Sequence, residues 1–199
     1  MKQTIALTSM AALIFFAFYI ASCSDSENKA VAKNESSAEP ANDDILKQGE
    51  HLVTTMGCND CHSPKRMGAN GPEIIEELMF SGFPSDRPVA KFDTKLIKSG
   101  FSIFYPDLTA AAGPWGLSFA ANLTPDSTGI GNWTEEQFKT ALTKGKYKGL
   151  ENNRMLLPPM PWFNFARLSD NEVKSIFAYL KSVKPVRNLV PQPIAPGKL

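Results

Sequence analysis

The residue types most capable of chemistry are concentrated in one short segment, CNDCH at positions 58–62. Two thiols three positions apart lie on one turn of chain, so both can add to vinyl groups on the same edge of one porphyrin. The next residue, His62, then lies under the iron, where its imidazole can serve as the proximal ligand. In an exported chain, C-x-x-C-H is the pattern of covalent haem attachment. The segment therefore predicts one haem c bound through Cys58 and Cys61, with His62 as an iron ligand.

Other uses of this segment have to be weighed against haem attachment. A thioredoxin-like redox pair needs a βαβ context, which we do not find around it. A zinc site needs four ligands, and His51 is the only other histidine in a chain with two His and three Cys. A structural disulfide accounts for the two thiols but leaves His62 without a role. The motif occurs once, which rules out a two-haem peroxidase.

The second axial ligand must come from elsewhere, and with no further histidine suited to this role a methionine is expected. We favour Met160, in the segment LPPMPW at 157–162. Prolines fix φ and restrain the residues before them, so we expect this segment to be rigid and to hold the Met160 side chain in one position. Met155 and Met79 are the alternatives. In a further alternative, Met160 only fills a gap in the core, which would leave the iron with an open site.

The N-terminus carries an export signal. Lys2 precedes an apolar run over 5–20, and small residues follow, ending at Cys23; this is the pattern of a secretory signal peptide. The segment Ile20-Ala21-Ser22-Cys23 resembles the lipobox of bacterial lipoproteins, which implies acylation of the Cys23 thiol and anchoring to a membrane. We expect a signal peptide over 1–22, a lipidated flexible tether over 23–42 and one domain over 43–199 in the periplasm. A transmembrane anchor or an ordinary cleaved signal are the alternatives.

Three helices are predicted around the motif. The first starts at Asp43 or Asp44 and leads into Cys58, with Gly49 at a close helix crossing and His51 on its surface. The second begins near Trp133, with a capping box between Thr134 and Gln137, and Gly145 at its end. The last opens with a capping box between Ser169 and Glu172. Its apolar positions at helical spacing are Val173, Ile176, Phe177 and Leu180.

The segments between these helices are less regular. Residues 65–121 are an insertion for which we expect a short helix over 73–79 and short strands over 101–105 and 117–121. The insertion would cover one haem edge or dock a partner. In the turn-rich loop 122–132, the polar groups, with the Trp133 indole, would either hold haem propionates or satisfy one another. The aromatic residues 162, 163 and 165 would wall the porphyrin or belong to an ordinary core.

Composition limits the classes of function. The 199 residues carry Lys+Arg 21 against Asp+Glu 20, a net charge of +1, so no basic field for nucleic acid is present. Apolar residues make up 43% of the chain, which excludes a wholly disordered protein.

Four segments together resemble single-haem, class I cytochrome c with His and Met ligands. They are the helix into CNDCH, the stretch NLTPDSTGIGNWTEEQF, the PPMPWF segment and SDNEVKSIFAYLKSVKPVRN. The second and fourth resemble cytochrome c subunits of bacterial membrane-bound dehydrogenases. The resemblance implies an all-α domain wrapped around the haem, with Cys58, Cys61, His62 and Met160 as haem-binding residues.

The function that follows is a membrane-tethered carrier of single electrons in a bacterial respiratory chain, not an enzyme. Its partners would be a dehydrogenase, a quinol-oxidising complex or a terminal oxidase, with no role for nucleic acid. A dedicated cytochrome subunit of a dehydrogenase complex is the first alternative, and an open-site haem protein is the second.

Overall fold

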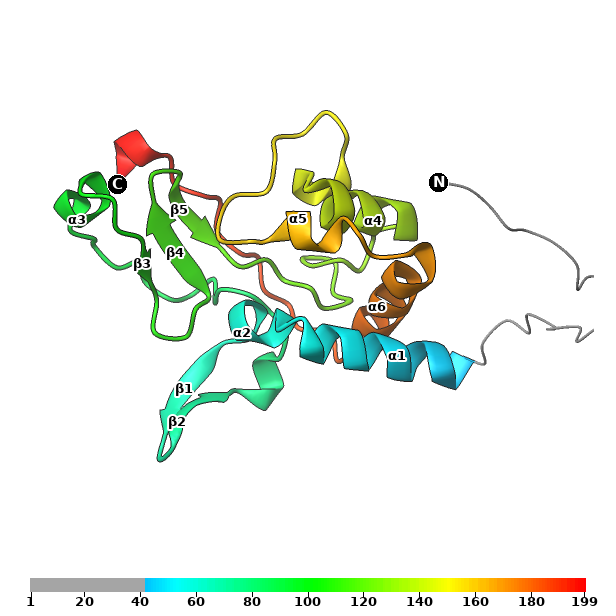
Figure 1. The fold of residues 1–199 in the computed structure, drawn as a ribbon. Coiled ribbons are helices and arrows are strands. Elements are labelled where there is room, and N and C mark those ends of the chain that lie inside the picture. Colours follow the sequence, from blue (N-terminus) through cyan, green and yellow to red (C-terminus); the bar gives the residue numbers. More distant parts are fainter. Residues whose placement is uncertain (1–41) are drawn as a thin grey trace, which may run out of the picture. The chain divides into compact units, whose positions relative to one another are not determined.

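The computed structural model describes residues 42–199 (Figure 1). The predicted signal peptide, Cys23 and the tether up to residue 41 lie outside the described residues. Between residues 42 and 199, no helix has both the length and the apolar character needed to span a bilayer.

Six α-helices and five strands make up this part of the chain. The helices are α1 (Asn42–Thr55), α2 (Cys58–His62), α3 (Thr94–Lys98), α4 (Glu135–Lys144), α5 (Trp162–Phe165) and α6 (Asp170–Ser182), with 3₁₀ helices η1 (Glu76–Leu78), η2 (Tyr147–Gly149) and η3 (Pro196–Lys198). The strands are β1 (Lys65–Gly68), β2 (Gly71–Ile74), β3 (Ile103–Phe104), β4 (Ala110–Gly113) and β5 (Gly116–Phe119). Helices α1, α4, α5 and α6 lie together, and the β3–β5 sheet lies on the other side of α2 (Figure 1).

The first and last long helices, α1 and α6, cross closely, as the sequence predicted. The crossing lies at Gly49, which is buried. A Cβ atom added there would overlap the Ser175 carbonyl group and lie 2.7 Å from the Cβ of Tyr179. Only a residue without a side chain permits the two backbones to approach this far. His51, on the same helix, is exposed, also as expected.

Local signals define the ends of α4 and α6. The Ser169 hydroxyl accepts from the Glu172 N–H and the Glu172 carboxylate accepts from the Ser169 N–H, so the predicted capping box at α6 is confirmed. At α4 the Thr134 hydroxyl accepts from the Gln137 N–H at 3.1 Å. The predicted return contact from Gln137 is wrong, because that side chain donates to the Lys148 carbonyl instead. Gly145 ends α4 in the left-handed conformation, with φ of 65°.

A core between the helices, here called the helical cluster, holds α1, α4 and α6 together. Its buried apolar side chains come from these three helices and from the connecting segments. They are Val53, Phe80, Ile130, Phe138, Leu142, Val173, Ile176 and Leu180.

The expectation of an all-α fold is wrong. Strands β1 and β2 form a two-stranded antiparallel sheet, and β3, β4 and β5 form a three-stranded one. The helix expected over 73–79 is also wrong, since Gly71–Ile74 is strand β2 and only Glu76–Leu78 makes a 3₁₀ turn. The strands expected over 101–105 and 117–121 correspond to β3 and β5, and β4 lies between them.

The three-stranded sheet is extended by a long-range pairing. Leu117 in β5 exchanges both of its main-chain hydrogen bonds with Ile194, so the C-terminal segment extends the sheet. A second core, here called the insertion cluster, covers the sheet: its buried members are Phe83, Tyr105, Ala110, Ala112 and Leu117, with Val190 and Ile194 packed against them. The Asn188 amide joins the C-terminal segment to the segment 81–83 by donating to the carbonyls of Ser81 and Phe83.

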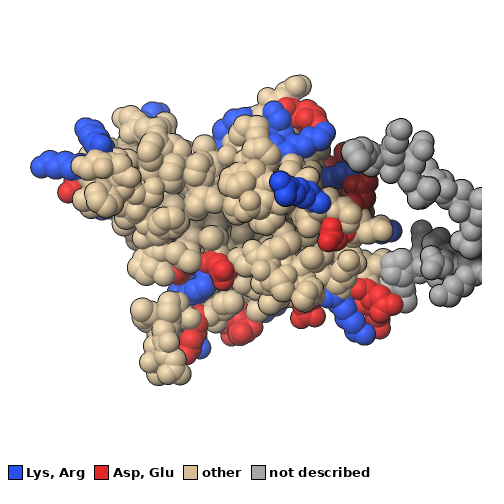
Figure 2. Space-filling view, viewed as in Figure 1, with Lys and Arg blue, Asp and Glu red and all other residues tan. Residues whose placement is uncertain are grey.

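The charged side chains are spread out. Figure 2 shows that Lys, Arg, Asp and Glu side chains lie mostly toward the edges of the face in view, and that neither sign forms a continuous field across it. This distribution agrees with the net charge of +1.

Candidate haem site

Helix α2 carries all three residues of the predicted attachment motif. Gly57, with φ of 69°, separates α1 from α2 in the left-handed conformation that glycine adopts without strain. Cys58 and Cys61 are free, half-buried thiols on this single turn. Burial raises the pKa of Cys58 to about 11 and also raises the pKa of Cys61. A reactive redox thiol requires the opposite shift, so the structure does not favour a thioredoxin-like pair.

The imidazole of His62 is buried and held in one tautomer. Its Nδ1 lies 2.7 Å from the carbonyl oxygen of Ala121. A carbonyl can only accept, so Nδ1 carries the proton and donates it, and Nε2 keeps its lone pair. Burial lowers the pKa of His62, an effect opposed by the hydrogen bond to Ala121 and reinforced by the charge of Lys65. A neutral ring with Nδ1–H donated to a carbonyl is the form in which histidine binds a metal.

The backbone around His62 is fixed by the segment that follows η1. The Gly82 N–H donates to the His62 carbonyl at 2.8 Å. Gly82 has φ of 76°, and a Cβ there would lie 2.6 Å from atoms of Ala121, the residue that accepts from the imidazole. The Ser63 hydroxyl accepts from the Phe80 N–H at 2.9 Å and donates to the Asn59 amide oxygen at 2.6 Å. The ring is therefore held by the Ala121 carbonyl, and the backbone that carries it is held by the segment 80–82.

The methionines differ in their surroundings. Met160 is half-buried and packs against the helical cluster, as do Cys58 and Met79. Met155 is 40% exposed and Met67 is 75% exposed. Burial therefore favours Met160 and Met79 over Met155 as the source of a sulfur atom beside Cys58.

The segment that carries Met160 is attached to the β3–β5 sheet. The Ser118 hydroxyl of β5 lies 2.6 Å from the Pro158 carbonyl, to which it donates. The Met160 N–H donates to the Leu157 carbonyl at 3.3 Å, which closes a turn around the two prolines. The stiffness predicted for this segment thus has an external support from β5.

The aromatic residues next to Met160 divide between core and surface. Phe165 packs against the helical cluster. The ring of Trp162 lies against Gly145, where an added Cβ would be 2.6 Å from its Cε2 atom. Phe163 is 64% exposed.

The polar groups of loop 122–132 satisfy one another and the C-terminal segment. The Asn122 amide donates to the Val186 carbonyl at 2.9 Å and its oxygen accepts from the N–H and hydroxyl of Thr124. The Asp126 carboxylate accepts from the N–H and hydroxyl of Thr128. Of the two roles expected for this loop, the structure favours internal satisfaction over a propionate site.

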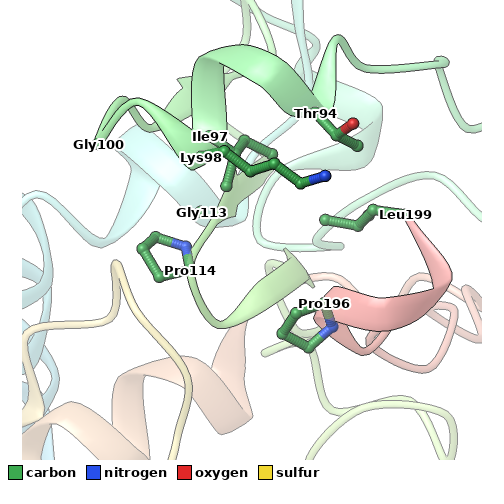
Figure 3. Close-up of a pocket in the computed structure, with 8 residues that line it drawn as sticks. All are labelled: Thr94, Ile97, Lys98, Gly100, Gly113, Pro114, Pro196 and Leu199. Atoms are coloured by element: carbon green, nitrogen blue, oxygen red, sulfur yellow. The ribbon is translucent and has the colours of Figure 1, made fainter.

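Two cavities have linings that include none of Cys58, Cys61 and His62. The larger, about 430 Å³, lies between α3, the β4–β5 turn and η3, and its lining includes Ile97, Pro114 and Pro196 (Figure 3). The smaller, about 180 Å³, lies beside the β1–β2 hairpin and is lined in part by Lys65 and Asp107.

The residues on and around α2 fit a covalently bound haem. Two thiols and a neutral imidazole with a free Nε2 come from one turn, and an apolar core with a half-buried methionine lies against that turn. A zinc site is not favoured, because residues 42–199 contain no group of three or more His, Cys, Asp or Glu that could hold a metal ion.

These features define a c-type cytochrome, and the comparison with known proteins agrees. The family model for cytochrome c matches residues 46–184, so the chain belongs to the cytochrome c family, whose prosthetic group is a covalently bound haem c. The expected class of protein is thereby confirmed.

Similar curated proteins are subunits of dehydrogenases. The chain is 30% identical over 159 residues to the cytochrome c subunit of the quinone alcohol dehydrogenase of Gluconobacter oxydans (strain 621H), which covers 79% of this chain and 25% of that protein. It is 29% identical over 150 residues to the gluconate 2-dehydrogenase cytochrome c subunit of Pantoea cypripedii, covering 74% and 25%. It is 29% identical over 143 residues to the fructose dehydrogenase cytochrome subunit of Gluconobacter japonicus, covering 71% and 22%. The chain thus spans about a quarter of the length of these relatives.

Four residues of the site were not identified from the sequence. Ser63 and Lys65 directly follow the motif, and a polar residue there could have been tested as a helix cap. Gly82, between two aromatic residues in FSGF, is the kind of glycine that signals close backbone approach. Ala121 acts only through its carbonyl, which leaves no signal in the sequence.

Proposed function

We propose that this chain is an electron-transfer cytochrome that holds one haem c on Cys58 and Cys61, with His62 and Met160 as the iron ligands. The observation that carries the proposal is the hydrogen bond from His62 Nδ1 to Ala121, which leaves Nε2 of a neutral ring available on the same turn as both thiols. When bound, the haem supplies one-electron chemistry by exchange between ferrous and ferric iron.

The chain's own contribution is to hold the ligands still. The Ala121 carbonyl fixes the imidazole, and the Gly82 N–H holds the backbone carbonyl of the same residue. For the second proposed ligand, the Ser118 hydroxyl restrains the turn before Met160 by donating to the Pro158 carbonyl. Ligands held in this way need little rearrangement when the charge of the iron changes, which suits a carrier better than an open catalytic site.

An electronic spectrum tests the ligands. Wild-type protein should give the pyridine haemochrome of one haem c per chain, and the oxidised protein should show the weak far-red band of a sulfur–iron bond. The band should vanish in Met160→Ala, because the thioether is removed. It should persist in Met79→Ala, the matched control, since Met79 packs against the same cluster.

The outcomes separate the alternatives. A band that survives Met160→Ala and vanishes in Met79→Ala would transfer the ligand role to Met79. A wild-type protein without this band would favour an open-site haem, and a colourless wild-type protein would refute the proposal as a whole.

For location we propose an exported, lipid-anchored protein, with the haem domain in the periplasm. The support is the lipobox-like segment ending at Cys23. Mass spectrometry of the mature protein tests it. We expect an N-terminal Cys23 carrying a diacylglycerol, and its loss in Cys23→Ser. An unmodified chain that begins elsewhere would contradict the lipid anchor.

For partners we propose a membrane-associated dehydrogenase, with this chain as its cytochrome subunit. The support is that the relatives are named as cytochrome subunits of alcohol, gluconate and fructose dehydrogenases. Purification of the tagged chain in mild detergent should recover a dehydrogenase. Recovery of the chain alone would favour a free carrier that meets a quinol-oxidising complex or a terminal oxidase.

A further inference from the structure

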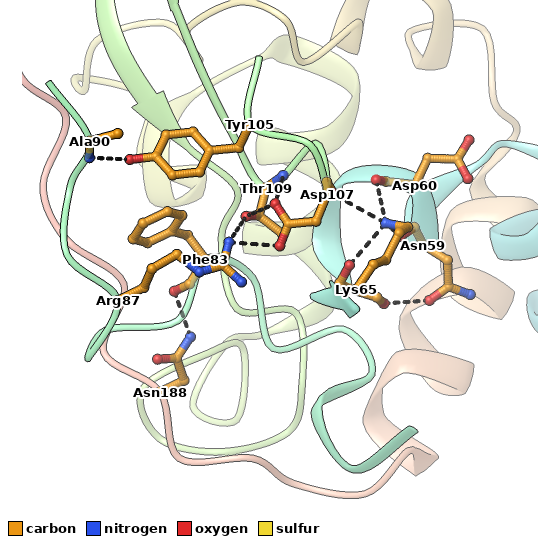
Figure 4. A network of polar contacts seen from close by, with 11 residues as sticks. Asn59, Asp60, Lys65, Phe83, Arg87, Ala90, Tyr105, Asp107, Thr109 and Asn188 are labelled. Carbon is orange, nitrogen blue, oxygen red and sulfur yellow. Dashed lines mark hydrogen bonds and ion pairs between the residues drawn. The ribbon is translucent and has the colours of Figure 1, made fainter. Parts of the chain in front are cut away.

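Lys65 makes an unusual set of contacts immediately after the attachment motif. Its ammonium group lies 2.7 Å from the Asp60 carbonyl, 2.9 Å from the Ser63 carbonyl and 3.1 Å from the Asn59 carbonyl. A fourth main-chain carbonyl, that of Asp107, lies at 3.2 Å (Figure 4). An ammonium group has three N–H donors, whereas a neutral amine has two. Four acceptors around one nitrogen therefore favour the charged form.

Three of these carbonyls flank His62 in the chain. The carbonyls at the end of a helix have no partner within it and carry the negative end of its dipole. Lys65 supplies both the donors and the positive charge at this end of α2. The ammonium group thus restrains the turn on which Cys61 and His62 lie.

The fourth contact connects this turn to the insertion. The Asp107 carboxylate is fixed by Arg87, whose Nη1 lies 2.7 Å from Oδ2, and by the Thr109 hydroxyl, which donates to Oδ1 at 2.8 Å. Figure 4 shows these contacts running from α2 through Lys65 to Asp107 and Arg87. The position of the Lys65 charge is therefore set by two elements.

The environment of Lys65 also bears on the strength of its field. Burial lowers the pKa of Lys65, while the carboxylates of Asp107 and Asp60 oppose this shift. A partly buried charge is screened less by salt than one in open solvent.

We infer that Lys65 is a positioning residue for the haem-bearing turn, and that its fixed positive charge raises the reduction potential of the haem. The inference rests on the proposed function. Ferrous iron has one positive charge fewer than ferric iron, so a nearby cation favours the reduced state. Removal of the cation should then lower the reduction potential.

Spectroelectrochemical titration of the full-length haem protein tests this inference with three variants. Lys65→Met removes the charge and keeps much of the side-chain length, and it should lower the reduction potential. Lys65→Arg keeps the charge in a different geometry, and its potential should stay near that of the wild type. Lys91→Met is the matched control, because it removes an exposed lysine of the same insertion and changes the net charge equally; its potential should hardly move.

Two results would overturn the inference. One is a potential in Lys65→Met no lower than that in Lys91→Met. The other is an equal fall in Lys65→Arg and Lys65→Met, which would mean that side-chain shape rather than charge is responsible. A wild-type protein without a haem spectrum would instead refute the proposed function.

A variant of opposite sign covers the case in which Lys65→Met yields no haem protein. Asp60→Asn removes the exposed carboxylate whose charge acts on Lys65, and the reduction potential should rise. An unchanged or lower potential in this variant would overturn the electrostatic role.

Discussion

Replacing Gly49 by alanine sets two opposing effects against each other at the crossing of α1 and α6. In an isolated helix the change would be favourable, because glycine pays more backbone entropy than alanine. At this position the new methyl group would overlap the Ser175 carbonyl and lie 2.7 Å from the Cβ of Tyr179. Both are close to or part of the α6 backbone, so no rotamer change relieves the contact, and the helices must move apart.

The magnitudes decide the sign. The gain in helix propensity from glycine to alanine is about 1 kcal/mol. Overpacking of a well-packed core costs about 1–3 kcal/mol. The upper part of that range applies here, because separation of the helices also loosens the helical cluster, to which α1 contributes Val53 and α6 contributes Val173, Ile176 and Leu180. We therefore expect Gly49→Ala to lower the free energy of unfolding by about 1–2 kcal/mol.

Urea unfolding followed by circular dichroism measures this change. With an m-value of about 2 kcal/mol/M, the midpoint should fall by roughly 0.5–1 M. Gly197→Ala is the matched control, because a Cβ at Gly197 meets nothing within 4 Å. Its unfolding free energy should stay within about 0.5 kcal/mol of the wild type. If Gly49→Ala were more stable than the wild type, helix propensity would dominate and the close crossing would be refuted.

Two further substitutions test the supports around the site. Ser118→Ala removes the hydroxyl that donates to the Pro158 carbonyl at 2.6 Å. We expect the free energy of unfolding to fall by about 1 kcal/mol and the far-red band to disappear at a lower temperature. An unchanged thermal midpoint of that band would contradict this role. For Asp107, burial by itself would raise the pKa, but the bonds from Arg87 and Thr109 outweigh it and lower the pKa. Because the folded-state pKa is depressed, this carboxylate stabilises the fold above its unfolded pKa of about 4, and the contribution is lost as the pH falls through the folded value. In Asp107→Asn, the free energy of unfolding should therefore fall less steeply with decreasing pH below about pH 4 than it does in the wild type. Urea unfolding at several pH values measures this slope, and a slope equal to that of the wild type would contradict the expectation.

The elements that the sequence predicted well are those with local signals. Ser169 and Glu172 satisfy each other across three residues, and Gly145 ends α4 by its own left-handed conformation. The attachment motif belongs to the same class, because its spacing over five residues already places both thiols on one turn. The crossing at Gly49 could be predicted because a lone glycine on a buried helix face has few other uses.

The elements that were missed depend on pairing with a neighbouring segment, a partner that the residues of the element do not specify by themselves. Ala110–Gly113 contains three alanines, which favour helix, yet it forms the central strand β4 because β3 and β5 pair with both of its edges. Gly71–Ile74 is strand β2 instead of the start of a helix because it pairs with β1 in an antiparallel hairpin, with Lys65 opposite Ile74. Nothing within either segment specifies these partners.

The three-stranded sheet, where the fold departs from an all-α domain, reaches the site at three points through β5 and the segments on either side of the β4–β5 hairpin. Just after β5, the Ala121 carbonyl holds the imidazole of His62, and within β5 the Ser118 hydroxyl holds the turn before Met160. Before β4, the Asp107 carbonyl accepts from Lys65 at the end of α2. Because one sheet restrains both His62 and Met160, the two residues proposed as iron ligands, the spacing between them is set by the sheet as well as by the helices. The C-terminal segment pairs with β5 at Leu117 and Ile194, so the strand that carries these contacts is paired on both of its edges, which limits how far either proposed ligand can move. The insertion is therefore tied to both residues proposed as iron ligands, and a partner that docked on it would act on both together.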